Sequence, residues 1–165
     1  MKVHSQTDVG LVRTLNEDAC RTGLLGENGA WAVVCDGMGG ANGGEIASET
    51  AVNSIEEQIL ASYEEDFKSE EMKLMLSTLI FHANSAVYDM AQENESLKGM
   101  GTTIVVAIVL DNVAHIAHAG DSRAYLLHNG NIMQITTDHS MVQELIKNGD
   151  LTVEQAKVHP QKNII

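Results

Sequence analysis

The sequence has few of the residues that mark several classes of protein. Its 165 residues include one proline, two cysteines and only 4% aromatic residues. Two cysteines cannot build the disulfide framework of a small secreted domain, which favours a reducing compartment. No window approaches the about 20 apolar residues that span a bilayer, and residues 1–10 have no apolar core of a signal peptide. We therefore expect a cytoplasmic protein that does not enter a membrane.

Basic residues are also scarce. The chain has 10 Lys and Arg against 23 Asp and Glu, and its formal net charge is -13 with His counted as neutral. The basic residues are scattered, so nucleic acid and anionic membrane surfaces are not expected as partners. The acidic excess fits bound cations, and it also fits a charge that only keeps the protein dissolved.

The order of apolar and polar residues predicts strands before and after two long helices. Strands are expected where apolar or β-branched residues run between polar turns. These predicted strands cover residues 3–7, 18–24, 30–35, 102–110, 113–119, 122–127 and 132–136. Apolar residues at steps of three and four predict helices at 44–61 and 69–92, joined by an acidic linker at 62–68.

Two shorter helices and two turns complete the prediction. The helices, at residues 140–147 and 152–157, each begin with a hydroxyl residue that can cap a free amide. Tight turns are expected at residues 111–112 and 128–131. A single α+β domain with largely antiparallel sheets follows, with the helices on the outer face of one sheet.

A glycine-rich segment begins directly after the predicted strand at residues 30–35. Such a segment can cradle a phosphate, or it can bend the backbone around a metal site. The dinucleotide fingerprint G-x-G-x-x-G fits poorly, because Gly37 and Gly39 match but the sixth position is Asn42. The lysine and hydroxyl pair of a P-loop is also missing. The pattern therefore offers little support for a phosphate cradle.

Acidic residues at the ends of predicted strands favour a metal site instead. Asp36 ends one strand, and Gly37 lets the backbone bend so that its carbonyl can face the same ion. Glu17 and Asp18 open the preceding strand, and Asp121 follows a third apolar strand. Carboxylate and carbonyl oxygens suit Mg²⁺ and Mn²⁺. Taken singly, each acid fits a turn or a cap better than a metal ligand, but three acids at strand ends shift the balance toward a shared site.

Other reactive side chains form weaker candidates. His115 and His118 lie three residues apart in a predicted strand and so face opposite sides, which disfavours a shared metal. A G-x-S-x-G nucleophile elbow is missing from the sequence. Cys35 lies in an apolar run, where a thiol has a raised pKa and is inert.

Several short motifs follow one another in a fixed order. They are residues 7–10 (TDVG) with Arg13, residues 16–18 (NED), 36–40 (DGMGG), 100–103 (MGTT), 119–125 (AGDSRAY), 137–140 (TDHS) and 159–163 (HPQKN). This ordered set resembles the metal-dependent serine/threonine protein phosphatases of type 2C in their compact bacterial form. The resemblance covers nearly the whole chain and is highly specific.

The resemblance implies a β-sandwich of two antiparallel sheets flanked by helix pairs. It also implies hydrolysis of phosphoserine and phosphothreonine on proteins, by direct attack of a water that two Mn²⁺ or Mg²⁺ ions activate. Phosphorylated proteins would be the substrates, and a serine/threonine kinase would be the functional partner.

The motif match also implies roles for the acidic residues. Asp36 would bridge the two metal ions, and the carbonyl of Gly37 would bind one of them. Asp18 and Glu17 would act mainly through metal-bound waters. Asp121 would help to hold a third, more weakly bound ion.

On the substrate side, the resemblance implies that Arg13 grips the phosphate, which suits a fork of donors meeting phosphate oxygens. Residues 140–163 resemble the family's mobile flap beside the active site. Some relatives have histidine where this chain has Met38, which cannot donate a proton. A metal-bound water would therefore have to protonate the leaving alkoxide.

The later aspartates that complete the two-metal site in the family have no counterpart in these 165 residues. We therefore expect an N-terminal fragment that binds metal weakly and has little or no activity. Unpaired sheet edges would favour self-association. One alternative is a non-catalytic, phosphatase-like module that binds or senses, and another is a nucleotide-dependent oxidoreductase, which has only the imperfect glycine pattern.

Overall fold

The computed structural model describes residues 1–64, 67 and 69–165, and these divide into two units. The first unit is Met1–His118 and the second is Ala119–Ile165. The acidic linker predicted at 62–68 lies in part outside the described residues.

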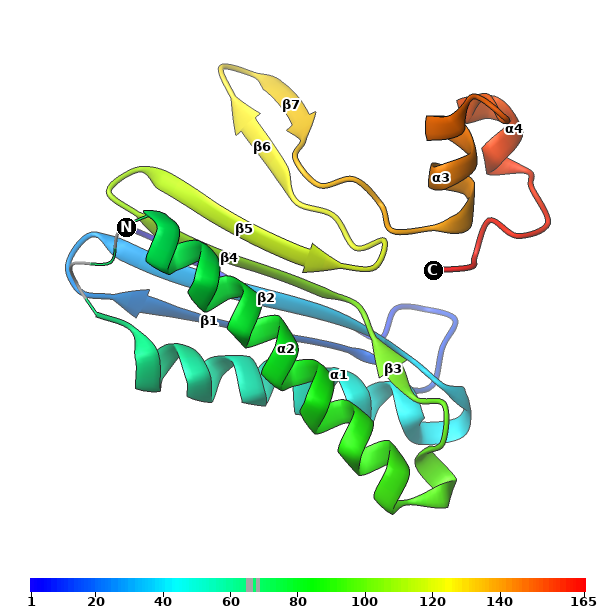
Figure 1. Ribbon diagram of the computed structural model, residues 1–165, viewed down its shortest axis with the longest axis horizontal. Helices are drawn as coiled ribbons and strands as arrows, with labels where there is room; N and C mark the ends of the chain where they lie inside the picture. Colours follow the sequence, from blue (N-terminus) through cyan, green and yellow to red (C-terminus); the bar gives the residue numbers. More distant parts are fainter. Residues whose placement is uncertain (65–66, 68) are drawn as a thin grey trace. The chain divides into compact units, whose positions relative to one another are not determined.

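The first unit is built on an antiparallel sheet (Figure 1). Strand β1 (Asp18–Leu25) pairs with β2 (Gly29–Met38), and β2 pairs on its other side with β4 (Ile104–Leu110). Strand β5 (Val113–Ala119) lies next to β4, and the short β3 (Gly101–Thr102) pairs with the end of β2. Strand β2 is therefore central, whereas β1 is an edge.

Two long helices cover one face of this sheet. Helix α1 (Gly40–Ser62) packs on β1 and β2, and α2 (Ser69–Glu93) packs on α1. Alternate residues of β2, among them Trp31, Val33 and Cys35, are buried in the same core as the apolar faces of the helices. The apolar residues that recur every 3.6 positions in the helices and every second position in the strand thus pack together in one core layer. The prediction of helices on one face of a sheet is confirmed.

The largest buried side chain requires a glycine on the neighbouring strand. Trp31 lies directly opposite Gly23 in the pairing of β1 with β2. A Cβ atom at Gly23 would clash with the indole Nε1 and lie 2.8 Å from Cε2. The missing side chain at Gly23 therefore makes room for the indole ring against the sheet.

The opposite face of the sheet is only partly covered. Residues of β2 that alternate with the core positions, such as Val34 and Asp36, are exposed. On β1, Asp18 and Leu24 are exposed in the same way. Asp18 and Asp36 therefore lie on the face that points away from the helices.

The second unit contains a hairpin followed by two short helices. The hairpin consists of β6 (Tyr125–His128) and β7 (Asn131–Gln134), joined by Asn129 and Gly130, both with positive φ. Two consecutive residues with positive φ are typical of a type I′ turn. The turn predicted at residues 128–131 is therefore confirmed.

Both short helices have the predicted hydroxyl caps. The side chain of Ser140 accepts a hydrogen bond from the Gln143 amide before α3 (Met141–Asn148). Thr152 accepts one from the Gln155 amide before α4 (Val153–Lys157) and forms a complete capping box.

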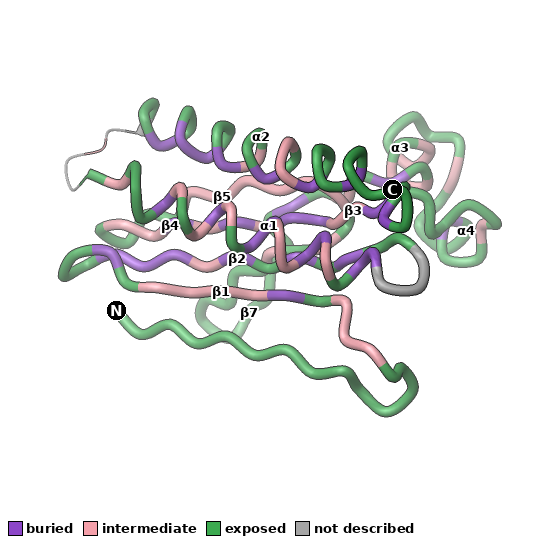
Figure 2. Tube along the Cα trace, turned by 90° about the horizontal axis from the view of Figure 1, so that it is seen from below, coloured by how far each residue is buried: buried purple, intermediate pink, exposed green. Residues whose placement is uncertain are grey.

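Several predicted boundaries are wrong. Residues 3–7 were expected to form a strand, but residues 1–9 have no strand partner in the described part of the chain and are exposed (Figure 2). Helix α1 begins at Gly40, four residues earlier than predicted. The strand expected at 102–110 is interrupted at Thr103, and the one expected at 122–127 begins only at Tyr125.

No helix in the described part of the chain is long and apolar enough to cross a membrane. This finding agrees with the hydropathy of the sequence.

Two neighbouring residues of α1 provide a test of this packing. Ile59 is fully buried, whereas Leu60 is exposed. We expect Ile59→Ala to lower the free energy of unfolding by about 2–5 kcal/mol, because it removes buried methylenes and leaves a cavity. Leu60→Ala should change it by less than about 0.5 kcal/mol. Urea denaturation followed by circular dichroism measures both values, and equal losses would contradict the assigned helix face.

Candidate metal and phosphate site

The pairing of β1 with β2 brings two aspartates together. Asp18 is the direct cross-strand partner of Asp36. Directly opposite residues in an antiparallel pair have their Cα atoms about 4.5–5.5 Å apart and their side chains on the same face. Both residues are exposed. The sequence-based expectation that Asp18 approaches Asp36 is thus met by the register of the sheet.

Thr103 holds the backbone of Asp36 from the other side. The Asp36 amide donates to the Thr103 hydroxyl at 3.0 Å, and the Thr103 amide donates to the Asp36 carbonyl at 2.9 Å. Thr103 is buried in the break between β3 and β4. This exchange continues the pairing where the regular strand is interrupted, and it fixes the backbone that carries the Asp36 carboxylate.

Gly37 is packed backbone against backbone. Its amide donates to the Glu17 carbonyl at 3.0 Å. A Cβ atom at Gly37 would clash with the carbonyl of Gly44 and lie 2.7 Å from the Glu17 carbonyl oxygen. A Cβ at Gly44 would in turn lie 2.9 Å from the Gly37 carbonyl oxygen. Both glycines are therefore needed for the start of α1 to lie against the end of β2.

Glu17 links the site to Arg13. The Arg13 guanidinium donates from Nη1 to Glu17 Oε2 at 2.7 Å. The Glu17 side chain is 22% exposed and that of Arg13 is 67% exposed. Arg13 thus has a fixed carboxylate partner while most of its guanidinium faces solvent.

The loop before β1 forms the wall of a cavity. Asn16 accepts from the Asp18 amide through Oδ1 at 3.1 Å and donates through Nδ2 to the Thr7 hydroxyl at 2.8 Å. A cavity of about 380 Å³ is lined by residues 8–13 and 15–18 together with Asp36. Arg13, Glu17, Asp18 and Asp36 therefore line one cavity.

The Asp18 and Asp36 carboxylates in this cavity have the same charge. Like charges directly opposite each other on neighbouring strands are destabilising. The only basic residue in the cavity lining, Arg13, is bonded to Glu17. A hard divalent cation would relieve the repulsion between Asp18 and Asp36, and the oxygen donors here are the type that Mg²⁺ and Mn²⁺ prefer. The donor set thus fits such an ion.

The number of protein ligands is small. Among residues 1–64, 67 and 69–165, no group of three or more His, Cys, Asp or Glu side chains could hold a metal ion. The pair of aspartates therefore leaves most positions around a cation to water, to backbone carbonyls or to further ligands.

Asp121 belongs to the second unit. It is exposed in the loop between β5 and β6, directly after Gly120, which has φ of 103°. The Gly120 carbonyl accepts from the His139 amide at 2.9 Å. Of the predicted site residues, Arg13, Glu17, Asp18, Asp36 and Gly37 lie together in the first unit, and Asp121 is held by the second.

Cys35 is a buried core residue. It is fully buried beside Asp36 in the sequence but on the opposite face of β2. Burial raises the pKa of its thiol to about 12. The prediction of an inert core thiol is consistent with this environment.

A second cavity, of about 370 Å³, lies at the other end of the β1–β2 hairpin. It is lined by turn residues including Glu27 and Asp111, with Tyr63, Phe67 and Leu110. Because its carboxylates sit in turns and are not opposed across strands, it offers no comparable arrangement of donors.

Two residues of the site were not assigned a role from the sequence. From the sequence, Thr103 is only part of the MGTT motif, and Gly44 is only the first residue of the helix predicted at 44–61. Their roles arise from tertiary contacts. Thr103 bonds to Asp36, which lies 67 positions earlier in the sequence, and Gly44 packs against the backbone of Gly37. The second threonine of the motif and the spacing of Gly37 and Gly44 were the available signals.

The chain is similar in sequence to known proteins. The sequence model described as "Protein phosphatase 2C" matches residues 12–161. The chain is similar to the serine/threonine phosphatase stp of Listeria welshimeri, with 38% identity over all of this chain and 65% of that protein. The chain thus spans about two thirds of the length of this relative.

Solved structures show the same likeness. The serine/threonine phosphatase Stp1 of Staphylococcus aureus has a TM-score of 0.88 and 41% identity, over 97% of this chain and 62% of that one. The catalytic domain of the serine/threonine protein phosphatase PstP, solved in complex with two manganese ions, has a TM-score of 0.74 and 34% identity, over 92% of this chain and 61% of that one.

The glycine packing at the site gives a direct test. We expect Gly37→Ala to lower the free energy of unfolding by more than about 3 kcal/mol, since overpacking against rigid backbone costs at least as much as overpacking a core. Gly101→Ala is the matched control, because its Cβ would meet only the flexible end of Met38, at 3.2 Å. Thermal unfolding of both variants makes the comparison. A Gly37→Ala protein as stable as the control would show that the backbone contact is absent.

Proposed function

Since this chain belongs to the protein phosphatase 2C family, we propose that it forms the part of a metal-dependent phosphatase that binds divalent cations and the phosphate of phosphoserine and phosphothreonine. The observation that supports this most directly is the position of Asp18 opposite Asp36 across β1 and β2. The two carboxylates face a cavity that also contains the guanidinium of Arg13.

Asp36 and the Gly37 carbonyl would hold two Mn²⁺ or Mg²⁺ ions, with Asp18 and Glu17 acting through waters. Such ions supply a water of lowered pKa and stabilise the charge that develops during in-line displacement at phosphorus. The cross-strand pairing, the Thr103 bonds and the Gly37–Gly44 contact place the carboxylates before any ion arrives. Pre-positioned ligands reduce the reorganisation that binding would otherwise require.

Arg13 would bind the substrate phosphate. Its Nη1 is bonded to Glu17 Oε2, and the remaining donors of the guanidinium are available for phosphate oxygens. The same Glu17 contact orients the side chain toward the cavity. Met38 at the end of β2 has no proton to donate, so water would protonate the leaving alkoxide.

The remaining parts of the proposal concern the wider molecule. Asp121 would help to hold a third, weaker ion, and residues 140–163 would form a flap within a single catalytic domain that includes residues 1–165. The substrates would be phosphorylated proteins, and a serine/threonine kinase would be the source of the phosphate groups. The two free cysteines, Cys20 and Cys35, support a cytoplasmic location.

A metal titration tests the aspartate pair without relying on activity. We expect Mn²⁺ to raise the melting temperature of the chain, because an ion bound only to the folded state stabilises it by mass action. Asp36→Asn should abolish this rise. In metal-free buffer the free energy of unfolding of the same variant should exceed that of the parent by about 0.2–1 kcal/mol, because the repulsion with Asp18 is lost.

The exposed Asp89 on α2 provides a control with the same change of charge. Asp89→Asn should leave the Mn²⁺ response intact. If Asp36→Asn retains the full response, the proposed metal site is wrong.

Hydrolysis of a phosphothreonine peptide tests the reaction itself. With only two opposed aspartates in the described residues, we expect this chain to turn over slowly or not at all. A version extended at its C-terminus to the length of its relatives should show Mn²⁺-dependent activity. Asp36→Asn should reduce that activity by at least about 100-fold, since loss of a ligand costs more than loss of its supporting partners. Phosphopeptide binding without hydrolysis in the extended version would favour a sensing module instead.

Self-association is part of the proposal, because β1 is an edge strand with the exposed Leu24. Exposed apolar edges favour pairing with another chain. We expect light scattering to show dimers or larger species, and Leu24→Lys to shift the population to monomers. Leu60→Lys, at a similarly exposed position of α1, should not. A parent chain that is monomeric at all concentrations would rule out association through this edge.

A further inference from the structure

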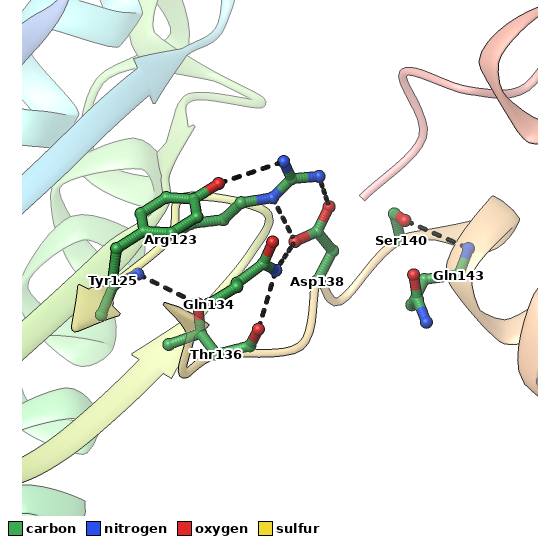
Figure 3. Close-up of polar contacts among 8 residues, drawn as sticks. Arg123, Tyr125, Gln134, Thr136, Asp138, Ser140 and Gln143 are labelled. Carbon is green, nitrogen blue, oxygen red and sulfur yellow. Dashed lines mark hydrogen bonds and ion pairs between the residues drawn. The ribbon is translucent and has the colours of Figure 1, made fainter. Parts of the chain in front are cut away.

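The loop that contains Asp121 is attached to the segment before α3 by an ion pair with two parallel hydrogen bonds. Arg123 Nε donates to Asp138 Oδ1 at 2.7 Å, and Arg123 Nη2 donates to Asp138 Oδ2 at 2.6 Å (Figure 3). The Asp138 side chain is 13% exposed and that of Arg123 is 45% exposed. This bidentate geometry fixes direction as well as distance, which a single contact between charges does not.

Further bonds fix the partners of this ion pair. Gln134 Nε2 donates to the Thr136 carbonyl at 2.8 Å and to Asp138 Oδ1 at 3.3 Å. Arg123 Nη1 lies 3.4 Å from the Tyr125 hydroxyl. The side chains of Arg123, Tyr125, Gln134 and Asp138 therefore form one connected network at the base of the β6–β7 hairpin, whereas the Ser140–Gln143 contact in Figure 3 is separate.

The backbone on both sides of Asp121 is fixed as well. On one side, the Gly120 carbonyl accepts from the His139 amide at 2.9 Å. On the other, the Ala124 amide donates to the buried Thr136 hydroxyl at 3.0 Å, and the Ala124 carbonyl accepts from the Ile135 amide at 2.8 Å. Asp121 is exposed and takes part in none of these bonds. The network thus fixes the backbone of the loop, while the Asp121 carboxylate takes no part in these bonds.

We propose that Arg123 and Asp138 are positioning residues that hold the Asp121 carboxylate in place for a divalent cation. This inference rests on the proposed role of Asp121 in holding the third ion. Arg123 lies two residues after Asp121, so the guanidinium fork sets the path of the loop between them. Supporting residues of this kind, which orient a ligand without touching the metal, strongly affect metal affinity.

The same network reaches the proposed flap. Asp138 comes two residues before Ser140, the N-cap of α3. The Met141 amide donates to the Ile164 carbonyl at 2.9 Å, which ties the start of α3 to the end of the segment. The carboxylate that holds Arg123 therefore lies two residues before the start of α3.

A purely structural role would give a different result. If the pair only stabilised the second unit, its loss would lower the melting temperature without changing how Asp121 responds to metal. The experiment therefore measures metal binding at the loop itself, and not activity or stability alone.

The test is a Mn²⁺ titration of the ¹⁵N-labelled chain, following the paramagnetic broadening of the backbone amide signals of residues 120–123. Asp121→Asn should raise the midpoint Mn²⁺ concentration by at least about 10-fold, and Arg123→Gln should raise it by about 10-fold. The double variant should match Asp121→Asn alone, since the effect of Arg123 passes through that carboxylate.

Two further variants make the result specific. Lys73→Gln breaks a 2.8 Å ion pair with Glu70 on α2, with the same change of charge, and should leave the midpoint unchanged. Arg123→Lys keeps the charge but loses the two parallel bonds. It should raise the midpoint by an intermediate factor, and it replaces Arg123→Gln if that variant does not fold.

The outcomes separate the two levels of the proposal. If Asp121→Asn raises the midpoint but neither Arg123 variant does, the positioning role is overturned and the third ion is retained. If Asp121→Asn has no effect, both the third ion and the positioning role are wrong, while the Asp36-dependent response to Mn²⁺ still tests the main site. Additive effects in the double variant would also overturn the positioning role.

Discussion

The register of β1 against β2 is the constraint on which the candidate site depends. It places Asp18 opposite Asp36 on one face, and it places Ala19 opposite Cys35 on the buried face. A slip of one residue would exchange the faces of the edge strand. Core packing and the site are therefore specified together, because the burial of Ala19 and Cys35 beneath the helices fixes the position of the two carboxylates on the other side.

This arrangement has an energetic cost that explains its chemistry. Two aspartates side by side on a chain of net charge -13 repel each other, and the nearby Arg13 is bonded to Glu17. The core under α1 and α2 offsets this local cost, as is common at functional sites. By this argument, a cation that removes the repulsion would bind more strongly to this pair than to an isolated surface carboxylate.

The sequence was most informative where the local pattern and the tertiary structure agree. The spacing of apolar residues located α1 and α2, and hydroxyl residues marked the starts of α3 and α4. It was least informative where contacts are distant. Residues 3–7 were predicted to form a strand but lack a strand partner in the described part of the chain, and the bonds of Thr103 to Asp36 span 67 positions. Helix α1 likewise begins early within a run of glycines, against the low helix propensity of glycine.

The two units hold their acidic residues by different physical means. In the first unit, Asp18 and Asp36 are placed by backbone pairing and by glycine contacts, which salt does not weaken. In the second, the loop of Asp121 depends on the partly exposed Arg123–Asp138 ion pair. An ion pair between partly exposed side chains weakens as the salt concentration rises. The position of Asp121 should therefore depend on ionic strength more than that of the aspartate pair.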